Sequence, residues 1–564
     1  MRNVSIGALI ILLGAGCQQK TPLSPDILGV TAENAMVVSA RKEASAIGLA
    51  AMAQGGNAFD AMFATELALA LVYPYAGNLG GGGFMVYRLA DGSTGSLDYR
   101  EMAPSAAHRD MFLDSLGNHD TAKSTVGGLS IGVPGTIKGI FAAQKKFGLL
   151  SVEALMNPVI ELAEKGYVVT QNQSEHLAQY REIIRQTTGT QSLYTQDISA
   201  GDTIKNPALA QTLRRLRDEG QEAFYKCDLA EHMSAYIQTK GGVIQSEDFE
   251  QYKVHWRDPI IFQYEDLTIT SMGPPSSGGI CLGQIMGMLE PYYFENLDHN
   301  NALYIQHLTE AERRAYADRS HYLGDPDFVS IPTEQLLSRA YLDQKMASFN
   351  PERAMASEHI SHGTLIGHES DETTHYSIVD PFGNAISVTT TINGAYGSKL
   401  FDPELGFFYN NEMDDFSAKP GTPNMFGLVG GAANAIAPGK RMLSSMTPTI
   451  VTKEGQLWQV LGTPGGSTII TTVLQIILNT HHFNMGMQQA VNQPRMHHQW
   501  LPDLIQFESD GFEQELLDSL EQRGYKTIQK DYQIIGKVDA IMRHSNGVLE
   551  AGADPRGDDT ALGF

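Results

Sequence analysis

The stretch that most constrains the fold of this chain is a predicted β-hairpin that opens with two adjacent threonines. The sequence TTHYSIV at residues 373–379 and the sequence NAISVTTTI at residues 384–392 both have strand character, rich in β-branched residues. The intervening DPFG at residues 380–383 suits a type I turn, because aspartate is favoured first, proline second and glycine fourth. The pattern therefore predicts two antiparallel strands joined by a tight turn.

The predicted hairpin brings a second hydroxyl close to its first residue. If Asp380 and Gly383 flank the turn, Thr373 faces Thr390, and a one-residue bulge would place Thr391 directly across from it. Threonine pairs are common in ordinary sheets, so the hairpin alone leaves a structural interpretation open. The alternative is that the chain is cut before Thr373. A threonine hydroxyl is a weak nucleophile without a base, and a newly freed α-amine, with a pKa near 8, would be such a base.

Composition excludes several classes of partner. The chain has 564 residues, 42% of them hydrophobic, which is ample for a large core. Its formal net charge of −24 repels nucleic acid and anionic lipid, so we expect no nucleic-acid partner.

The amino terminus predicts export. Residues 1–17 combine one basic residue, a short apolar run and small residues that end at Cys17, which is typical of a bacterial lipoprotein signal. We expect an exported, periplasmic protein, attached to the membrane only if Cys17 is lipidated, with residues 18–34 as a tether. No later stretch is long and apolar enough to span a bilayer. Two further cysteines remain, Cys227 and Cys281, and their pairing is left open.

The pattern of the mature chain changes along its length. One helix is expected before Gly55-Gly56, and a second between Asn57 and Pro74, followed by a glycine loop that leads into a strand. A strand is expected to end at Arg100, and residues 150–345 are mainly helical. Residues 350–372 are a polar connector, after which short strands and one long apolar helix follow.

Eleven further stretches of the sequence, called blocks here, help to identify the family to which the hairpin points. Together with it they resemble, in order, the γ-glutamyltransferases (γ-glutamyltranspeptidases), a family of N-terminal nucleophile hydrolases. The blocks are GNLGGGGFMVYR, LDYREMAP, GVPGTIKG, PPSSGG, AYADRSHYLGDPDF, NNEMDDFSAKPG, NMFGLVGGAANAIAP, KRMLSSMTPTIV, GTPGGSTIITTVLQ, PRMHHQWLPD and DPRGDDTALG.

The resemblance implies an α+β fold, the four-layer αββα sandwich, built from two intertwined subunits cut from one precursor. Autocatalytic cleavage between Glu372 and Thr373 would leave a large subunit of residues 35–372 and a small subunit of residues 373–564, held together as a heterodimer. No cofactor or metal is implied.

The resemblance also implies the chemistry. Thr373 would be both nucleophile and α-amine base, Thr391 would position the amine, and the N–H groups of Gly465 and Gly466 would form the oxyanion hole. The enzyme would transfer the γ-glutamyl group of glutathione, or of another γ-glutamyl compound, to water or to the amine of an amino acid or peptide.

Substrate recognition is implied to match a zwitterion. Arg100 would bind the α-carboxylate, with the hydroxyls of Ser444 and Ser445 as further donors. The α-ammonium would be bound by three polar residues, Asn393, Glu412 and Asp415. In the lid-like segment, Phe426 replaces a tyrosine common in bacterial members, which puts a lid hydrogen bond in doubt.

Other interpretations of single motifs are weaker. The run GNLGGGG lacks the Lys-Ser/Thr continuation of a phosphate loop and is expected to be a structural turn. The pairs His481-His482 and His497-His498 match no metal-binding spacing, and His375 is expected to be structural because the α-amine lies nearer the hydroxyl. Two alternative functions remain: a cephalosporin or glutaryl acylase of the same superfamily, and a non-catalytic exported lipoprotein that binds peptides.

Overall fold

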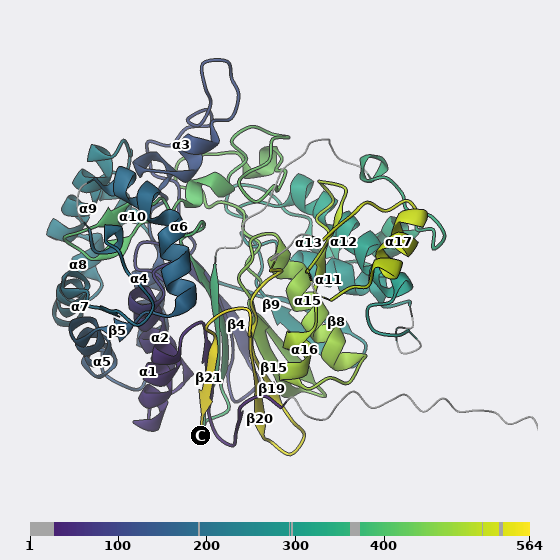
Figure 1. Cartoon of the computed structure of the whole chain (residues 1–564), viewed down its shortest axis with the longest axis horizontal. Helices are drawn as coiled ribbons and strands as arrows, with labels where there is room; N and C mark the ends of the chain where they lie inside the picture. The colour runs from purple at the N-terminus through teal and green to yellow at the C-terminus, as the bar shows by residue number, and fades with distance from the viewer. Residues whose placement is uncertain are drawn as a thin grey trace, which may run out of the picture.

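Two seven-stranded antiparallel sheets lie face to face between two layers of helices (Figure 1). This computed structural model describes residues 28–189, 192–292, 294, 297–360, 373–509, 511–529 and 534–564. The export signal, Cys17 and Glu372 therefore lie outside the described residues. The four-layer αββα arrangement predicted above is confirmed.

The first sheet has the strand order β1-β20-β19-β15-β14-β9-β8. Its strands are β1 (Thr31–Ala32), β20 (Leu549–Ala553), β19 (Asp539–Arg543), β15 (Gln456–Gly462), β14 (Thr449–Lys453), β9 (Leu267–Ser271) and β8 (Ile260–Tyr264). The second sheet has the order β21-β2-β10-β11-β3-β4-β7. Its strands are β21 (Thr560–Gly563), β2 (Met36–Ser39), β10 (Thr374–Val379), β11 (Ala385–Thr391), β3 (Gly82–Arg88), β4 (Thr94–Asp98) and β7 (His255–Arg257).

Both sheets interleave strands from before and after residue 373. In the second sheet, β10 pairs with β2 on one side, and its hairpin partner β11 pairs with β3 on the other. In the first sheet, β14 pairs with β9. A chain cut before residue 373 would stay assembled, because separating its two parts would break strand pairs in both sheets.

One helical layer covers the second sheet, on the left of Figure 1. It contains α1 (Lys42–Ala53), α2 (Ala58–Val72), α4 (Thr136–Phe147) and α5 (Val152–Lys165). Outside or above these lie α3 (Thr121–Thr125), α6 (Gln171–Thr188), α7 (Pro207–Glu219), α8 (Glu222–Tyr225), α9 (Cys227–Thr239) and α10 (Ser246–Gln251).

The other helical layer covers the first sheet. It contains α11 (Gly278–Leu289), α12 (Ala302–Tyr322), α15 (Thr468–His481) and α16 (Met487–Asn492), with α13 (Thr333–Leu336), α14 (Arg339–Met346) and α17 (Gln514–Gln522) at its edge. Three small sheets complete the fold: β5 (Tyr167–Val168) with β6 (Thr203–Ile204), β12 (Phe401–Asp402) with β13 (Phe407–Phe408), and β16 (Met496–His497) with β17 (Ile505–Phe507) and β18 (Thr527–Gln529).

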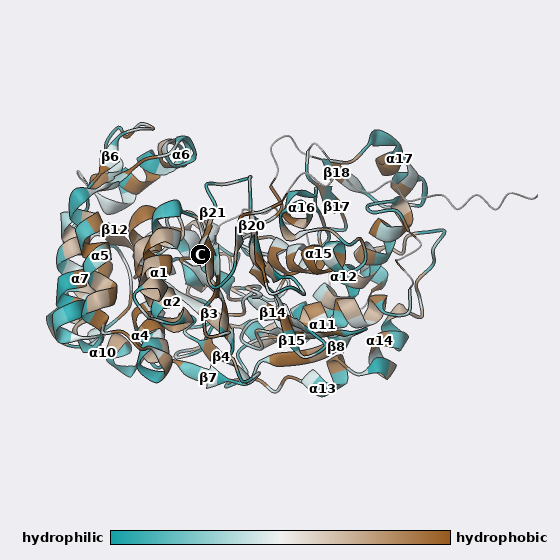
Figure 2. Cartoon of the chain, turned by 90° about the horizontal axis from the view of Figure 1, so that it is seen from below, coloured by the Kyte–Doolittle hydropathy of each residue, from teal (hydrophilic) through white to brown (hydrophobic). Residues whose placement is uncertain are grey.

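Hydrophobic burial holds the layers together. Apolar side chains such as Val86, Val460 and Ile541 fill the space between the sheets. Figure 2 shows brown strands inside and teal on outer helices such as α7. All 15 residues of α2 are buried, and its amino terminus carries a capping box made by Asn57 and Asp60. Such a cap contributes about 1 kcal/mol.

A buried carboxyl group on α2 supports the hairpin from behind. Glu66 accepts hydrogen bonds from the Tyr376 hydroxyl and from the Thr390 hydroxyl, each at 2.7 Å. Burial raises the pKa of Glu66 to about 7, while the two hydrogen bonds oppose the shift. This carboxyl group ties one strand residue of each hairpin arm to the helical layer.

Several predicted boundaries need small corrections. The helices at Lys42–Ala53 and Ala58–Val72 are confirmed, with Asn57 as the predicted cap. The strand expected to end at Arg100 ends at Asp98 instead. The last residues of the predicted tether belong to the fold, because Thr31 and Ala32 of β1 pair with β20.

Two further expectations concern cysteines and membrane spans. Cys227 is exposed and Cys281 is buried, and both are free thiols, so the structure shows no bridge between them. Among the described residues, none of the helices has the length and apolarity needed to cross a bilayer.

Candidate active site

The hairpin places Thr373 at the amino end of a central strand, with only 5% of its surface exposed. In the observed register, Thr374 pairs with Thr390 and Val379 with Ala385. Continuing this register by one step sets Thr373 opposite Thr391 without a bulge. The expected pairing of Thr373 with Thr390 is therefore wrong by one residue.

The turn explains the difference in register. The Gly383 N–H donates to the Asp380 carbonyl at 3.1 Å, and the Asp380 N–H donates to the Asn384 carbonyl at 3.0 Å. Gly383 has φ of +92°, a conformation that glycine adopts readily. A type I turn followed by this left-handed residue makes a three-residue loop, which adds one residue to the two-residue loop assumed from the sequence.

Two hydrogen bonds and a close approach of the neighbouring backbone fix the position of Thr391. Its hydroxyl accepts the Asn393 N–H at 2.7 Å, and its carbonyl accepts the Asn78 side-chain amide at 2.9 Å. A Cβ at Gly81 would lie 2.0 Å from the same carbonyl oxygen, so the glycine run allows the backbone to approach β11 closely. The Thr391 hydroxyl has a second lone pair, so it can also accept an N–H of an amine and leave the lone pair of that amine free.

The two predicted oxyanion glycines lie in the loop between β15 and α15. Gly465 has φ of +135° and Gly466 has φ of +53°. The carbonyl of Gly465 accepts the N–H of Thr468 at 2.9 Å and its hydroxyl at 2.8 Å, which anchors the loop to the start of α15. A Cβ at Gly466 would lie 2.6 Å from the ring of Phe426, so the predicted lid residue lies directly over this glycine.

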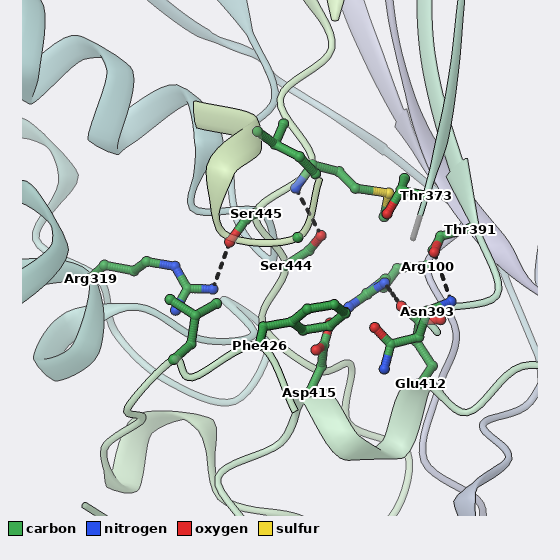
Figure 3. Close-up of a pocket in the computed structure, with 14 residues that line it drawn as sticks. Arg100, Arg319, Thr373, Thr391, Asn393, Glu412, Asp415, Phe426, Ser444 and Ser445 are labelled. Carbon is green, nitrogen blue, oxygen red and sulfur yellow. Dashed lines mark hydrogen bonds and ion pairs between the residues drawn. The ribbon is translucent and has the colours of Figure 1, made fainter. Parts of the chain in front are cut away.

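A buried cluster of charges forms one wall of the pocket beside Thr373 (Figure 3). The Arg100 guanidinium forms ion pairs with Glu412 and, at 2.5 Å, with Asp415, and lies 3.7 Å from Glu101. The pKa of Glu412 is raised well above its usual value, because burial outweighs the attraction of Arg100. Burial raises the pKa of Glu101 to about 7, although Arg100 opposes it.

The cation of the cluster is held firmly in its charged form. Burial alone would lower the pKa of Arg100, but Glu412, Asp415 and Glu101 raise it above the ordinary value. Because carboxylates already satisfy Arg100, an incoming carboxylate has to exchange with them. A zwitterion suits this exchange, since its ammonium can take the carboxylates that its carboxylate displaces.

Ser444 and Ser445 lie on the wall next to this cluster. The Ser444 hydroxyl accepts the Met446 N–H at 3.1 Å, and the Ser445 hydroxyl accepts the guanidinium of Arg319 at 3.0 Å. Arg319, on α12, also donates to the Ser277 hydroxyl at 2.9 Å. Arg319 is not among the site residues predicted from the sequence, although it lies in the block AYADRSHYLGDPDF. Its signal was an arginine on a helix whose other positions are mostly buried.

The pocket collects the residues that sequence analysis assigned to the site. Those that line it are Arg100, Thr373, Thr391, Asn393, Glu412, Asp415, Phe426, Ser444, Ser445 and Gly466. Gly465 lines the other side of Thr373, in a separate cleft. The pocket volume is about 20 Å³, which holds about one water molecule. A substrate group therefore requires the Arg100 ion pairs or the lid to move.

His375 has the environment of a structural residue. Its two ring nitrogens lie 2.9 Å from the Thr389 hydroxyl and 3.1 Å from the Ser377 hydroxyl. Burial lowers the pKa of His375 to about 3, so the imidazole is neutral at physiological pH. Both ring nitrogens already have partners on the strands, which leaves base chemistry to another group.

A group of potential metal ligands lies elsewhere. The structure brings Glu265 to His481 and His482, with the His481 imidazole 2.7 Å from the carboxylate. His482 instead contacts the Tyr264 hydroxyl at 2.8 Å. None of these residues lines the pocket of Thr373. Spacing along the sequence could not anticipate Glu265, which comes from the turn between β8 and β9.

Two stacked antiparallel sheets between helical layers, with a threonine at the amino end of a central strand, define the class of N-terminal nucleophile hydrolases. The model of a protein family described as Gamma-glutamyltranspeptidase matches residues 44–564 of this chain. The chain belongs to the gamma-glutamyltranspeptidase family.

Individual relatives agree with this assignment. The chain is 41% identical to the glutathione hydrolase proenzyme of Escherichia coli K12, over 100% of this chain and 99% of that one. The structure resembles the crystal structure of cephalosporin acylase from Bacillus halodurans, with a TM-score of 0.85, 25% identity and coverage of 97% and 98% of the two chains. It also resembles the crystal structure of Helicobacter pylori gamma-glutamyltranspeptidase, with a TM-score of 0.56, 38% identity and coverage of 62% and 99%.

Proposed function

We propose that this chain is the precursor of a γ-glutamyltransferase and glutathione hydrolase, activated by cleavage between Glu372 and Thr373. The observation that carries the proposal is the placement of Thr373 beside a buried Arg100–Glu412–Asp415 cluster, which matches the two charges of an amino-acid end. The products are a large subunit of residues 35–372 and a small subunit of residues 373–564.

The proposed mechanism is acyl transfer in two steps. The Thr373 hydroxyl attacks the γ-amide carbonyl of the donor while its α-amine accepts the proton, and the leaving amine takes that proton when the C–N bond breaks. Water or another amine then attacks the γ-glutamyl ester and restores the Thr373 hydroxyl. The N–H groups of Gly465 and Gly466 stabilise the oxyanion of each tetrahedral intermediate, worth about 3 kcal/mol for a well-placed donor.

Recognition of the donor follows from the charge cluster. The substrate α-carboxylate replaces Glu412 and Asp415 on Arg100, with the hydroxyls of Ser444 and Ser445 beside it. The α-ammonium is taken up by Glu412, Asp415 and Asn393. Glutathione supplies such a γ-glutamyl group, and amino acids or peptides serve as acceptors.

The amino terminus completes the proposal. Residues 1–17 direct export to the periplasm, and lipidation of Cys17 anchors the mature heterodimer to the membrane. Determining the amino termini of the purified mature protein by mass spectrometry tests both cut sites at once. We expect one chain to begin with Thr-Thr-His-Tyr; an active enzyme without such a chain would overturn the proposal.

An acylase activity is the second candidate, supported by the similarity to the cephalosporin acylase structure over 97% of this chain. The two functions differ in the acyl group, because a glutaryl group lacks the ammonium that Glu412 and Asp415 would bind. Comparing hydrolysis of γ-glutamyl and glutaryl anilides separates them. We expect γ-glutamyl hydrolysis to be faster by at least about 100-fold, since an unpaired buried charge costs several kcal/mol. The non-catalytic lipoprotein lacks comparable support, given the family assignment.

A further inference from the structure

Two histidines and one glutamate form a cluster that lines neither of the cavities beside Thr373. The cluster consists of Glu265, His481 and His482. One possible ligand atom of each residue, an imidazole nitrogen or a carboxylate oxygen, lies within 4.8 Å of those of the other two. In a tetrahedral site with bonds of about 2.1 Å, neighbouring ligand atoms are about 3.4 Å apart. Small shifts of these side chains would therefore close the cluster around an ion.

The cluster brings together distant parts of the chain. Glu265 lies in the turn between β8 and β9, whereas His481 ends α15 and His482 follows it. Side chains that are adjacent in a helix do not face each other, yet these two imidazole rings converge at the helix end, with 4.7 Å between their centroids. An ion bound here would connect a segment that precedes residue 373 to one that follows it.

The protein leaves one nitrogen of His481 without a partner. Its Nε2 lies 2.7 Å from the Glu265 carboxylate. Its Nδ1 is buried and has no hydrogen-bond partner among the described residues, and only 8% of the side chain is exposed. His375, by contrast, has a hydroxyl beside each ring nitrogen. Buried polar atoms without a partner are rare in proteins, and a bound ion is one physical reason for them.

Neighbouring side chains fit the surroundings of a metal ion. The Tyr264 hydroxyl lies 2.8 Å from His482 Nε2. A metal-bound imidazole commonly uses its second nitrogen in such a contact, which fixes the orientation of the ring. Asp266 adds a second carboxylate, 3.7 Å from the His481 imidazole. The Glu265 side chain is 41% exposed, so an ion can enter from solvent.

We propose that Glu265, His481 and His482 bind one Zn²⁺ ion, which stabilises the fold by linking the parts of the chain before and after residue 373. Two imidazoles and one carboxylate are a ligand set that zinc uses in proteins, with a water molecule as the fourth ligand. Ca²⁺ and Mg²⁺ fit less well, because they prefer oxygen ligands. This inference does not depend on the proposed function, since all three ligands lie outside the cavities of Thr373.

The test measures Zn²⁺ binding by the purified full chain, without an affinity tag and after removal of metal with a chelator. Isothermal titration calorimetry should show one Zn²⁺ bound per chain with a Kd below about 10 µM. The Tm should rise by about 2 °C at a free Zn²⁺ concentration of about 100 times the Kd, because the ion binds the folded chain. A wild-type chain that binds no Zn²⁺ below this Kd would overturn the inference.

Matched variants locate the ion. Glu265→Gln and His481→Gln each remove one ligand and should weaken Zn²⁺ binding by at least about 100-fold. Tyr264→Phe removes only the outer contact of His482 and should weaken binding by about 10-fold. Glu358→Gln is the control, because Glu358 is also an exposed glutamate beside a histidine but belongs to no such cluster. It should bind Zn²⁺ like the wild type.

The outcomes separate this inference from the proposed function. Circular dichroism of the metal-free variants shows which are folded, and either ligand variant is sufficient for the test. Zn²⁺ affinity that is unchanged in the folded ligand variants would place the ion elsewhere and overturn the inference. Zn²⁺ binding is measured without a γ-glutamyl substrate, so a chain that is cut and active but binds no Zn²⁺ contradicts the inference alone.

Discussion

The two cavities that meet at Thr373 differ in size and in the side chains that line them. The pocket has a volume of about 20 Å³ and is lined by charged side chains such as Arg100, Glu412 and Asp415. The cleft has about 450 Å³ and is lined by aromatic rings together with Lys537, Arg556 and Asp558. A small, charged pocket discriminates sharply, because a buried charge without a partner costs several kcal/mol. A larger cleft with aromatic walls discriminates weakly, since each aromatic contact contributes about 1 kcal/mol.

This difference suits an acyl-transfer enzyme with one strict and one tolerant substrate. Under the proposed function, the charged pocket would bind the γ-glutamyl end by charge at fixed spacing, and the cleft would lie on the side of the amine component. Thr373 lines both cavities, so this one residue could serve both. Substitutions on the two sides should therefore change different kinetic parameters.

The largest effect is expected from substituting Thr373, the proposed nucleophile, which lines both cavities. Thr373→Ala should remain a single uncut chain on denaturing electrophoresis and lose at least about 10⁴-fold in hydrolysis, because both the hydroxyl and the cleavage that frees the amine are gone. Thr391→Ala should mature or turn over slowly, since it withdraws the positioning hydroxyl.

The neighbouring threonine provides the control. The Thr374 hydroxyl has no hydrogen-bond partner among the described residues, so Thr374→Ala should still be cut. Two bands from Thr373→Ala would contradict the assignment of the nucleophile.

The next effect concerns the charged pocket alone. Arg100→Ala leaves Glu412 and Asp415 without their shared cation and should lower kcat/KM for a γ-glutamyl donor by about 10²- to 10³-fold. Arg100→Lys, which keeps the charge but not the bidentate geometry, should fall between Arg100→Ala and the wild type. The exposed Arg339→Ala serves as the control.

The comparison between the cavities makes this prediction specific. The partition of the acyl-enzyme between dipeptide and water should change far less than donor kinetics in the Arg100 variants. Equal losses on both sides would mean that the pocket and the cleft are not separate subsites.

A smaller effect is expected at the loop between the cavities. Gly466→Ala places a methyl group 2.6 Å from the Phe426 ring and forces alanine to φ of +53°, so kcat should fall by about 30-fold. Adding Phe426→Ala should restore part of this loss by removing the clash. Steady-state kinetics of the single and double variants give the comparison; a double variant no faster than Gly466→Ala would refute the steric account.

The smallest effect is expected behind the hairpin, where neither cavity reaches. The pKa of Glu66 is raised to about 7 from an ordinary value of 4.5, so the folded state favours the protonated form. Its contribution to stability is present below about pH 4.5 and is lost as the pH rises through about 7. Glu66→Gln cannot ionise, so its Tm relative to the wild type should increase between pH 5 and pH 8.

Thermal unfolding of the mature protein at several pH values measures this shift, which we expect to be about 3 °C at most. The kinetics of Glu66→Gln with the donor and with the acceptor should both change little, and by the same factor. A Tm difference that is constant with pH would show that Glu66 does not titrate in this range.

Local features were predictable from the sequence. Asn57 caps α2 as expected, because a polar side chain before an apolar run satisfies free N–H groups at a helix start. The hairpin also follows from a local pattern, whereas cleavage before Thr373 is what the resemblance to the family implies. Residues such as Arg100 and Ser445 were recognised only through their sequence blocks.

The amino-acid sequence by itself determined most helices and strands, because caps, turns and strand propensity depend on near neighbours. Its resemblance to a family supplied most residues around the charged pocket. Only the tertiary structure decided the register through Gly383, the contact of Arg319 with Ser445, and the cleft that joins α6 to the Gly465 loop. These features depend on contacts between segments far apart in the chain, which no local pattern encodes.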